Sequence, residues 1–325
     1  MTSILVLGAA GMVGRKLVDR LVETGHLRGK EISYLTLVDI VEPQPPKGAT
    51  CPVVTKACDF SNEGEAEQLV ASKPDVIFHL AAIVSGEAET DYDKGYRINL
   101  DGSRRLFEAV RMIGDGYCPR VVYTSSIAVF GAPFPDPIPD DFNLTPLTSY
   151  GTQKAMGEML LSDLSRRGFM DGIGIRLPTI VVRPGKANLA ASGFFSGIIR
   201  EPLNGQEAIL PVDDDVLHWM ASPRAAVGFL MHSAEIDGET VGANRNMTMP
   251  GVAATVADEI DTLRKIGGEA RVKLIRRVPN DAIKQIVSGW PRRFETSRAA
   301  SLGYTADASF EAIVRTYIED ENISI

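Results

Sequence analysis

A tyrosine and a lysine stand four residues apart in the segment SYGTQKA (149–155). On a helix, residues at this spacing rise from one face, so the side chains of Tyr150 and Lys154 are expected to lie side by side. A free tyrosine has a pKa of about 10, and a nearby ammonium group lowers that pKa because it favours the phenolate. The pair is therefore a candidate general base for taking a proton from an alcohol. The alternative is a chance pair on a solvated helix.

Two adjacent serines precede this pair. Ser125 and Ser126 lie in YTSSIAVFG (123–131), at the end of an expected strand and about twenty residues before the tyrosine. A serine hydroxyl at this place would hold the reacting oxygen by a hydrogen bond, and the lysine could also hold the ribose of a nicotinamide nucleotide. These residue types together indicate oxidation of a secondary alcohol.

Three glycines at intervals of three residues, Gly8, Gly11 and Gly14, lie between an expected strand (3–7) and an expected helix. Such a turn lets the backbone approach a pyrophosphate at the positive end of the helix, although a tight turn without a ligand also uses glycines. Asp39, after the second expected strand, could accept hydrogen bonds from ribose hydroxyls and would repel the extra phosphate of NADP. The pattern favours NAD; a solvated, loop-capping aspartate is the alternative.

Two further segments end expected strands. Asp59 either contacts the adenine edge or forms a turn before Ser61 and Asn62, and the pattern supports both readings equally. The small residues of HLAA (79–82) leave room for a flat cofactor that passes over the edge of the sheet.

The elements that would position these residues alternate along the first half of the chain. Continuous apolar runs rich in β-branched residues predict strands covered on both faces, at 3–7, 34–38, 52–55, 75–80, 120–124 and 174–182. Helical patterns lie between them, and in one of these helices Met156, Leu160 and Leu164 are expected to form the core face. This alternation predicts an α/β fold with a doubly wound, mostly parallel Rossmann sheet, which binds ligands at the carboxyl ends of its strands.

The alternation ends near residue 180. Helices are expected over 222–235 and 256–268, and a strand over 272–278. We interpret residues 1–180 as an NAD-binding Rossmann domain to which 216–250 return. Residues 181–215 and 251–325 would form a smaller, discontinuous C-terminal substrate-binding lobe.

Composition narrows the class of partner. The chain has 325 residues, 44% of them hydrophobic, and a formal net charge of −8, so neither nucleic acid nor an anionic membrane is an expected partner. Three cysteines without a CxxC motif favour a reducing compartment, the cytoplasm, and four scattered histidines predict no metal site. No apolar stretch approaches the ~18 residues that a membrane span requires.

Six ordered motifs resemble the extended short-chain dehydrogenase/reductase family: GAAGMVG, Asp39, HLAA, Asn99 in YRINLDGS, TSSIAVFG and the Tyr150–Lys154 pair. The resemblance implies an NAD-dependent oxidoreductase in which Tyr150 is the general base and Lys154 its activator. It also implies that Ser126 binds the reacting oxygen, with Ser125 as the neighbouring alternative, and that Asn99 organises a water relay. Family members often form homodimers through two helices, here near 101–113 and 149–167. The residues expected at the cofactor are Gly8, Gly11, Met12, Val13, Gly14, Asp39, Asp59, Leu80, Ala81, Ala82, Asn99, Tyr150, Lys154 and Pro178.

The substrate expected from the resemblance is a small sugar acid. Family members that act on nucleotide sugars carry Arg-x-x-Asn after the sixth strand, but here Thr179 follows Arg176 in place of the asparagine. The segments VSGEAE (84–89), HWMASPR (218–224) and GWPRRF (289–294) resemble instead members that oxidise the C2 hydroxyl of a four-carbon sugar acid with NAD. The residues expected at the substrate are Ser85, Ser126, Tyr150, Thr179 and Arg183.

A carboxylate substrate needs a cationic or donor-rich pocket. Arg183, Lys186 and Asn188 are candidates, with Arg183 first, although a surface arginine is as good a reading. Ser85 could equally stabilise its own loop. Two alternatives to the sugar-acid dehydrogenase stay open: a nucleotide-sugar epimerase or dehydratase, and a regulator that binds dinucleotide without chemistry.

Overall fold

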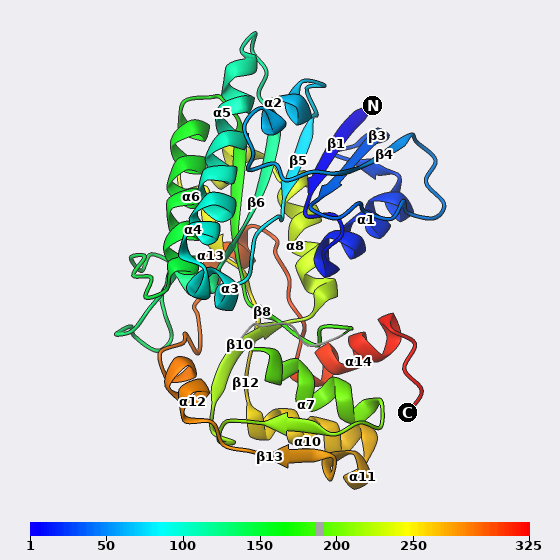
Figure 1. Cartoon of the computed structure of the whole chain (residues 1–325), viewed down its shortest axis with the longest axis vertical. Helices are drawn as coiled ribbons and strands as arrows, with labels where there is room; N and C mark the ends of the chain where they lie inside the picture. Colours follow the sequence, from blue (N-terminus) through cyan, green and yellow to red (C-terminus); the bar gives the residue numbers. More distant parts are fainter. Residues whose placement is uncertain (186–191) are drawn as a thin grey trace.

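The structure, a computed structural model, describes residues 1–185 and 192–325 of the chain and centres on an eight-stranded sheet (Figure 1). Seven strands run parallel, and the eighth, β2 (His26–Leu27), pairs antiparallel with the start of β3. The parallel strands, in spatial order, are β4 (Val53–Ala57), β3 (Lys30–Asp39), β1 (Thr2–Leu7), β5 (Val76–His79), β6 (Arg120–Ser126), β7 (Asp171–Leu177) and β11 (Asn246–Thr248).

Helices cover both faces of this sheet, which confirms the predicted doubly wound α/β fold. On one face α1 (Met12–Thr24) and α8 (Pro223–Glu235) pack against each other and against the strands. On the other face lie α2 (Glu65–Val70), α5 (Ser103–Ile113) and α6 (Ser149–Arg166), as Figure 1 shows. The helices on each face pack against apolar side chains of the inner strands, which are buried on both sides of the sheet.

The prediction of a single strand over 174–182 is wrong. The chain leaves the large sheet after Leu177, and Pro178 separates β7 from β8 (Thr179–Ile180). A proline has no N–H to donate to a ladder, so the strand ends there. Strand β8 belongs to a three-stranded sheet with β10 (Leu217–Ala221) and β12 (Val252–Thr255).

The strand expected over 272–278 is also shorter than predicted. A helical turn, α11 (Glu269–Val272), precedes β13 (Ile275–Arg277), which pairs with β9 (Ala208–Leu210).

The core face predicted for α6 is only partly correct. Met156 is 37% exposed, whereas Leu160 and Leu164 are partly buried and pack against the core on this side of the large sheet. The side chains that face the sheet include Lys154, Glu158 and Leu161, at 2%, 1% and 0% exposure. The apolar pattern did not include the most deeply buried stripe of this helix, because that stripe contains the charged residues Lys154 and Glu158.

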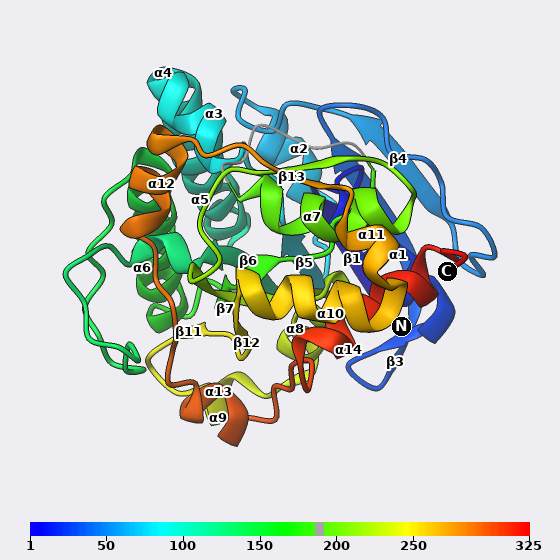
Figure 2. The same cartoon turned by 90° about the horizontal axis from the view of Figure 1, so that it is seen from below.

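The second core forms the lower lobe in Figure 1, and Figure 2 views that lobe from below. It is built by α7 (Gly193–Leu203), α10 (Val256–Gly267) and α14 (Phe310–Asp320), with α12 (Asp281–Ser288) at its edge. From the segment 216–250, α8 and β11 join the large sheet layer, whereas β10 joins the small sheet. Ala299 in α13 (Ser297–Ser301) and Tyr304 pack into the core of the large sheet, although they lie between α12 and α14 in sequence.

None of the helices in the described ranges combines the length with the apolar character needed to cross a bilayer.

Candidate active site

The site lies where the central strands end. Leu7 of β1 pairs with His79 of β5, and His79 pairs with Tyr123 of β6, so these three strands end at one edge. The glycine turn, the HLAA segment and Ser126 therefore follow neighbouring strands at the carboxyl edge, where doubly wound sheets bind ligands.

The glycine turn is shaped by close backbone contacts. Gly8 has a φ of +89°, and a Cβ on it would lie 2.7 Å from the amide nitrogen of Ala81. A Cβ on Gly14 would overlap the carbonyl oxygen of Gly8. Gly11 precedes α1, and no side chain caps this helix. The first amides of α1, which begins with Met12 and Val13, thus remain available for an anion, and the turn fits a pyrophosphate.

Asp39 lies beside the same turn. Its carboxylate accepts hydrogen bonds from the amides of Ala10 at 2.9 Å and Ile40 at 2.7 Å. The remaining lone pairs of an ionised carboxylate can accept ribose hydroxyls. Asp59, by contrast, is bound into a turn by the hydroxyl of Ser61 at 2.5 Å and by Arg97 at 2.8 Å. Of its two readings, these contacts favour the turn.

The structure brings the side chains of Tyr150 and Lys154 together. Thr148 caps α6 by accepting from the amide of Gly151, and Gly151 packs so closely on the carbonyl of Ala128 that a Cβ would overlap it. The start of α6 is thereby held over the segment after β6. The Nζ of Lys154 lies 5.8 Å from the centre of the Tyr150 ring and donates to the carbonyl of Thr124 at 2.8 Å.

The electrostatics of the pair differ from the prediction. Burial raises the pKa of Tyr150 to about 12, and the side chain of Ser126 acts in the opposite direction. Burial also lowers the pKa of Lys154 to about 7, although Glu158 acts to raise it. Burial of the phenol thus outweighs the predicted acidification by the ammonium group in the chain alone.

The two adjacent serines face different partners, because successive residues of a strand point to opposite sides. Ser125 donates to Glu158 at 2.5 Å, and Glu158 forms a buried ion pair with Arg176 at 2.8 Å. Ser126 accepts from the amide of Ala128 at 3.1 Å and is the serine that acts on the Tyr150 phenol. These contacts favour Ser126 over Ser125 at the reacting oxygen.

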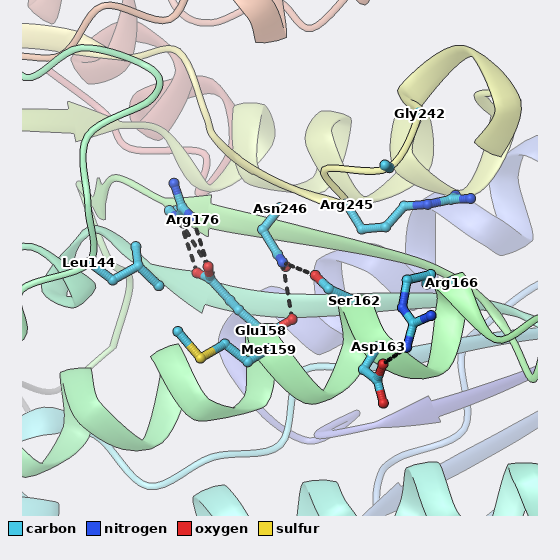
Figure 3. Close-up of a pocket in the computed structure, with 11 residues that line it drawn as sticks. Leu144, Glu158, Met159, Ser162, Asp163, Arg166, Arg176, Gly242, Arg245 and Asn246 are labelled. Carbon is cyan, nitrogen blue, oxygen red and sulfur yellow. Dashed lines mark hydrogen bonds and ion pairs between the residues drawn. The ribbon is translucent and has the colours of Figure 1, made fainter.

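A cavity of about 490 Å³ lies at the Arg176–Glu158 pair (Figure 3). It is lined by α6, β7, the segment before β11, and Asn246 of β11, whose side chain donates to Ser162 at 2.8 Å. Neither Ser126, Tyr150 nor Lys154 lines it. This cavity is therefore separate from the candidate active site.

Asn99 braces the loop after β5 against α6. It lies in a π-helical segment (Tyr96–Gly102), is 1% exposed, and accepts from the amide of Ile83 at 2.9 Å. Its side-chain nitrogen donates to Gln153 at 2.8 Å. The main-chain carbonyl of Asn99 accepts from the hydroxyl of Ser103 at 2.7 Å.

The residues expected at the substrate lie on three segments. Thr179 lies two residues after Leu177, and Leu177 is the residue of β7 that pairs with Ser126 of β6. The hydroxyl of Thr179 lies 2.6 Å from Nε2 of His218. Ser85 begins α3 (Ser85–Thr90), and Pro178 connects β7 to β8.

Arg183 is held at the edge of the lobe by its neighbours. Its guanidinium donates to Ser192 at 3.1 Å, and its carbonyl accepts from Arg200 at 2.7 Å. Across the two described ranges no carboxylate pairs with Arg183. Lys186 and Asn188 lie outside the described residues.

Sequence reasoning missed three residues around the site. Glu158 lies four residues after Lys154, as Lys154 does after Tyr150. This spacing places all three on one face of the helix, so Glu158 could have been predicted from the sequence. Gln153 and His218 gave no such signal, because their partners are far away in the sequence. Within residues 1–185 and 192–325 no group of His, Cys, Asp or Glu side chains is arranged to hold a metal ion.

Residues 4–219 match the model of the NAD dependent epimerase/dehydratase family. A D-erythronate dehydrogenase of Cupriavidus necator is 44% identical over 99% of both chains. A second D-erythronate dehydrogenase, of Haemophilus influenzae, is 36% identical over 97% of this chain and 98% of its own. Among solved structures, a protein of Agrobacterium tumefaciens described as a nucleoside-diphosphate-sugar epimerase is 62% identical, with a TM-score of 0.97 over 99% of this chain and 95% of its own.

Proposed function

The chain belongs to the NAD dependent epimerase/dehydratase family, and we propose that within this family it oxidises the C2 hydroxyl of D-erythronate to 2-dehydro-D-erythronate. The names of the two full-length relatives support the substrate. The observation that carries the chemistry is the convergence of Tyr150, Lys154 and Ser126 at the carboxyl edge of the sheet, beside the glycine turn.

NAD is the cofactor, as predicted from Asp39 and the glycine turn. The uncapped start of α1 would hold its pyrophosphate, and Asp39 would accept its ribose hydroxyls. Bound NAD supplies the acceptor for the hydride that leaves C2.

In the proposed reaction the deprotonated Tyr150 takes the proton of the C2 hydroxyl, the hydride on C2 leaves for NAD, and the C2–O bond becomes the carbonyl of a ketone. Ser126 donates a hydrogen bond to that oxygen and keeps it within reach of the phenol. Lys154 is fixed by the Thr124 carbonyl and would hold the ribose of the nicotinamide half of NAD. Asn99 keeps the loop after β5 and the start of α6 at a constant separation.

Arg183 is our candidate for binding the substrate carboxylate. Its guanidinium is not offset by a carboxylate in the described ranges, and burial together with the nearby Arg200 lowers its pKa. An anion placed beside it would restore charge balance and gain a charge-assisted hydrogen bond. Ser85 and Thr179 are candidates for the substrate hydroxyls.

The experiment is incubation of the purified protein with D-erythronate and NAD while NADH absorbance is followed. We expect turnover with NAD and at least about tenfold less with NADP, because Asp39 repels the additional phosphate. Tyr150→Phe should reduce kcat by at least about 100-fold while NAD still binds, since general-base catalysis contributes this much. Failure of every C3 to C6 aldonate to yield NADH would contradict the proposal.

A nucleotide-sugar epimerase is the second candidate, because the A. tumefaciens structure carries that description. Such an enzyme returns the hydride to its substrate, so it would contain tightly bound NAD and produce no net NADH. Thr179, in place of the asparagine expected for such substrates, speaks against it. Assay with a nucleotide-sugar panel separates the two.

We also propose that the protein is a cytoplasmic homodimer. Helices α5 and α6 pack side by side, and Met112 of α5 and Met159 of α6 are 66% and 64% exposed. A second copy would cover these side chains. Met159→Glu should shift the mass in sedimentation equilibrium from dimer to monomer, and Ile209→Glu, at a site 62% exposed in the lobe, should not. The unpaired thiols of all three cysteines support a reducing compartment.

A further inference from the structure

The ammonium group of Lys154 is buried beside two aromatic rings. Lys154 is 2% exposed, and its Nζ lies 5.0 Å from the centre of the Tyr123 ring and 5.8 Å from the centre of the Tyr150 ring. An ammonium group has three protons to donate, and within the described ranges the acceptor that it reaches is the carbonyl of Thr124, at 2.8 Å. The rings therefore replace part of the water that a charged lysine loses on burial.

The ring of Tyr123 is held in place under α6. Tyr123 lies in β6 at 0% exposure, and the rings of His79 and Phe107 pack against it with centres 5.4 and 5.9 Å away. On the side of α6, a Cβ on Gly157 would overlap the Tyr123 hydroxyl. The ring consequently lies below the turn of α6 that runs from Lys154 to Gly157.

The hydroxyl of Tyr123 does not account for an aromatic residue at this position. It has no hydrogen-bond partner among the described residues, and a buried hydroxyl without a partner costs free energy. The part of Tyr123 that meets a charge is its ring. The face of an aromatic ring attracts a cation within about 6 Å, and the attraction is stronger where water is excluded.

The other titratable rings around Lys154 are uncharged at neutral pH. Burial lowers the pKa of His79 on β5 to about 3, so this imidazole is neutral. Burial raises the pKa of Tyr150 on α6 to about 12, and it raises the pKa of Tyr123 on β6 as well.

The carboxylates near α6 are engaged elsewhere. Glu158, one turn beyond Lys154, pairs with Arg176 of β7 at 2.8 Å. Glu89 of α3 accepts from the amide of Ser149 at the start of α6, at 2.9 Å. Burial lowers the pKa of Lys154 to about 7, so this lysine is the group of the site that changes charge near neutral pH.

We propose that Tyr123 is a positioning residue whose ring face keeps Lys154 charged and directed at the ribose of the nicotinamide half of NAD. This inference rests on the proposed function and adds the group that supports its lysine. The ring face stabilises the ammonium form but not the neutral amine. The ammonium form donates charge-assisted hydrogen bonds and attracts the anionic dinucleotide, so NAD affinity depends on it.

The test is isothermal titration with NAD from about pH 5.5 to about pH 9. Because NAD favours the charged lysine, wild-type affinity should be constant below about pH 7, the pKa of free Lys154, and fall as pH rises above it. Tyr123→Leu removes the ring and should lower the pH at which this fall begins by about 0.5 to 1.5 units. Its affinity should then be about 3- to 30-fold below wild type at about pH 8, and within about twofold at about pH 5.5.

Control variants separate the ring face from the rest of the side chain. Tyr123→Phe keeps the ring and should show the wild-type pH dependence. Phe78→Leu also removes a ring at 0% exposure, from the neighbouring strand β5 but in the core on the opposite face of the sheet, so it should lose stability without moving the pH dependence. Tyr123→Met, which fills irregular space, replaces Tyr123→Leu if thermal unfolding shows that the leucine variant does not fold.

A role in packing alone would lower NAD affinity by the same factor at every pH. That result, or an unchanged pH dependence without the ring, would overturn the inference and leave the dehydrogenase standing if D-erythronate still yields NADH. Absence of NADH with every hydroxy acid, together with the expected shift in NAD binding, would overturn the proposed function and not the role of Tyr123.

Discussion

The phenol of Tyr150 is a weaker acid in this fold than in water, since burial raises its pKa to about 12. A general base acts only in its deprotonated form, and a raised pKa makes that form rarer at neutral pH. We therefore expect kcat/KM for D-erythronate at saturating NAD, which reports on the protein before the acid binds, to increase by about tenfold per pH unit from about pH 7 to about pH 10. A pH–rate profile checks this, and a plateau that begins near neutral pH would contradict it.

Single residues also show where sequence reasoning stops. The spacing of Tyr150 and Lys154 was enough to predict that they meet, because four residues make one turn of helix. The spacing could not give their pKa values, which depend on burial under the surrounding chain. The choice between Ser125 and Ser126 likewise depended on Glu158, a residue whose side chain reaches the strand only in the folded protein.

The turn between β1 and α1 depends on glycine for packing as well as for the cofactor. Gly14→Ala would force a Cβ against the Gly8 carbonyl and push the start of α1 away from β1. We expect NAD affinity to fall by at least about tenfold, with a loss of stability of about 1 to 3 kcal/mol. Isothermal titration with NAD and thermal unfolding measure these two effects.

Gly228→Ala is the matched control, because Gly228 is also inside a helix, α8, and a Cβ there would meet nothing within 4 Å. This variant should bind NAD like wild type and gain up to about 1 kcal/mol from the better helix propensity of alanine. Equal behaviour of the two variants would show that the contact with the Gly8 carbonyl has no consequence.

Elements were predictable where their apolar pattern was continuous and their ends were marked by glycine. Strands β1, β5 and β6 have the continuous apolar pattern, and Gly25 and Gly114 mark the ends of helices α1 and α5. The chain over 174–182 is equally apolar, yet Pro178 divides it between two sheets, and only the partner β10 shows where the second part goes. For helix α6 the apolar pattern missed part of the buried face. That face includes Lys154 and Glu158, and a search for apolar residues overlooks charged residues that are buried.

The whole molecule combines two cores, and the second could not be traced from sequence because its parts are far apart along the chain. Val181 and Val182, helix α10 and helix α14 meet in one cluster. In the other direction, Ala299 and Tyr304 return to the core of the large sheet. Both cores are therefore tied by the same C-terminal segment, and we expect the chain to unfold as one unit.

A buried carboxyl group in the second core makes the stability of this unit depend on pH. Glu259 of α10 is 0% exposed, and neither of its side-chain oxygens has a partner in the described ranges. Burial, with the charge of Asp258, raises its pKa well above the ordinary value. The folded state then retains a proton that the unfolded state releases near pH ~4.3, so stability must fall as pH rises above that value.

Glu259→Gln retains the shape of the neutral carboxyl group and removes this dependence. We expect the variant to match wild type near pH ~4 and to become the more stable protein at neutral pH. The difference should be about 1.4 kcal/mol for each unit by which burial raises the pKa. Urea unfolding at several pH values measures it. Glu63→Gln, which removes an exposed carboxyl group, should give the wild-type profile. If Glu259→Gln also kept the wild-type slope, the buried carboxyl group would not be the cause.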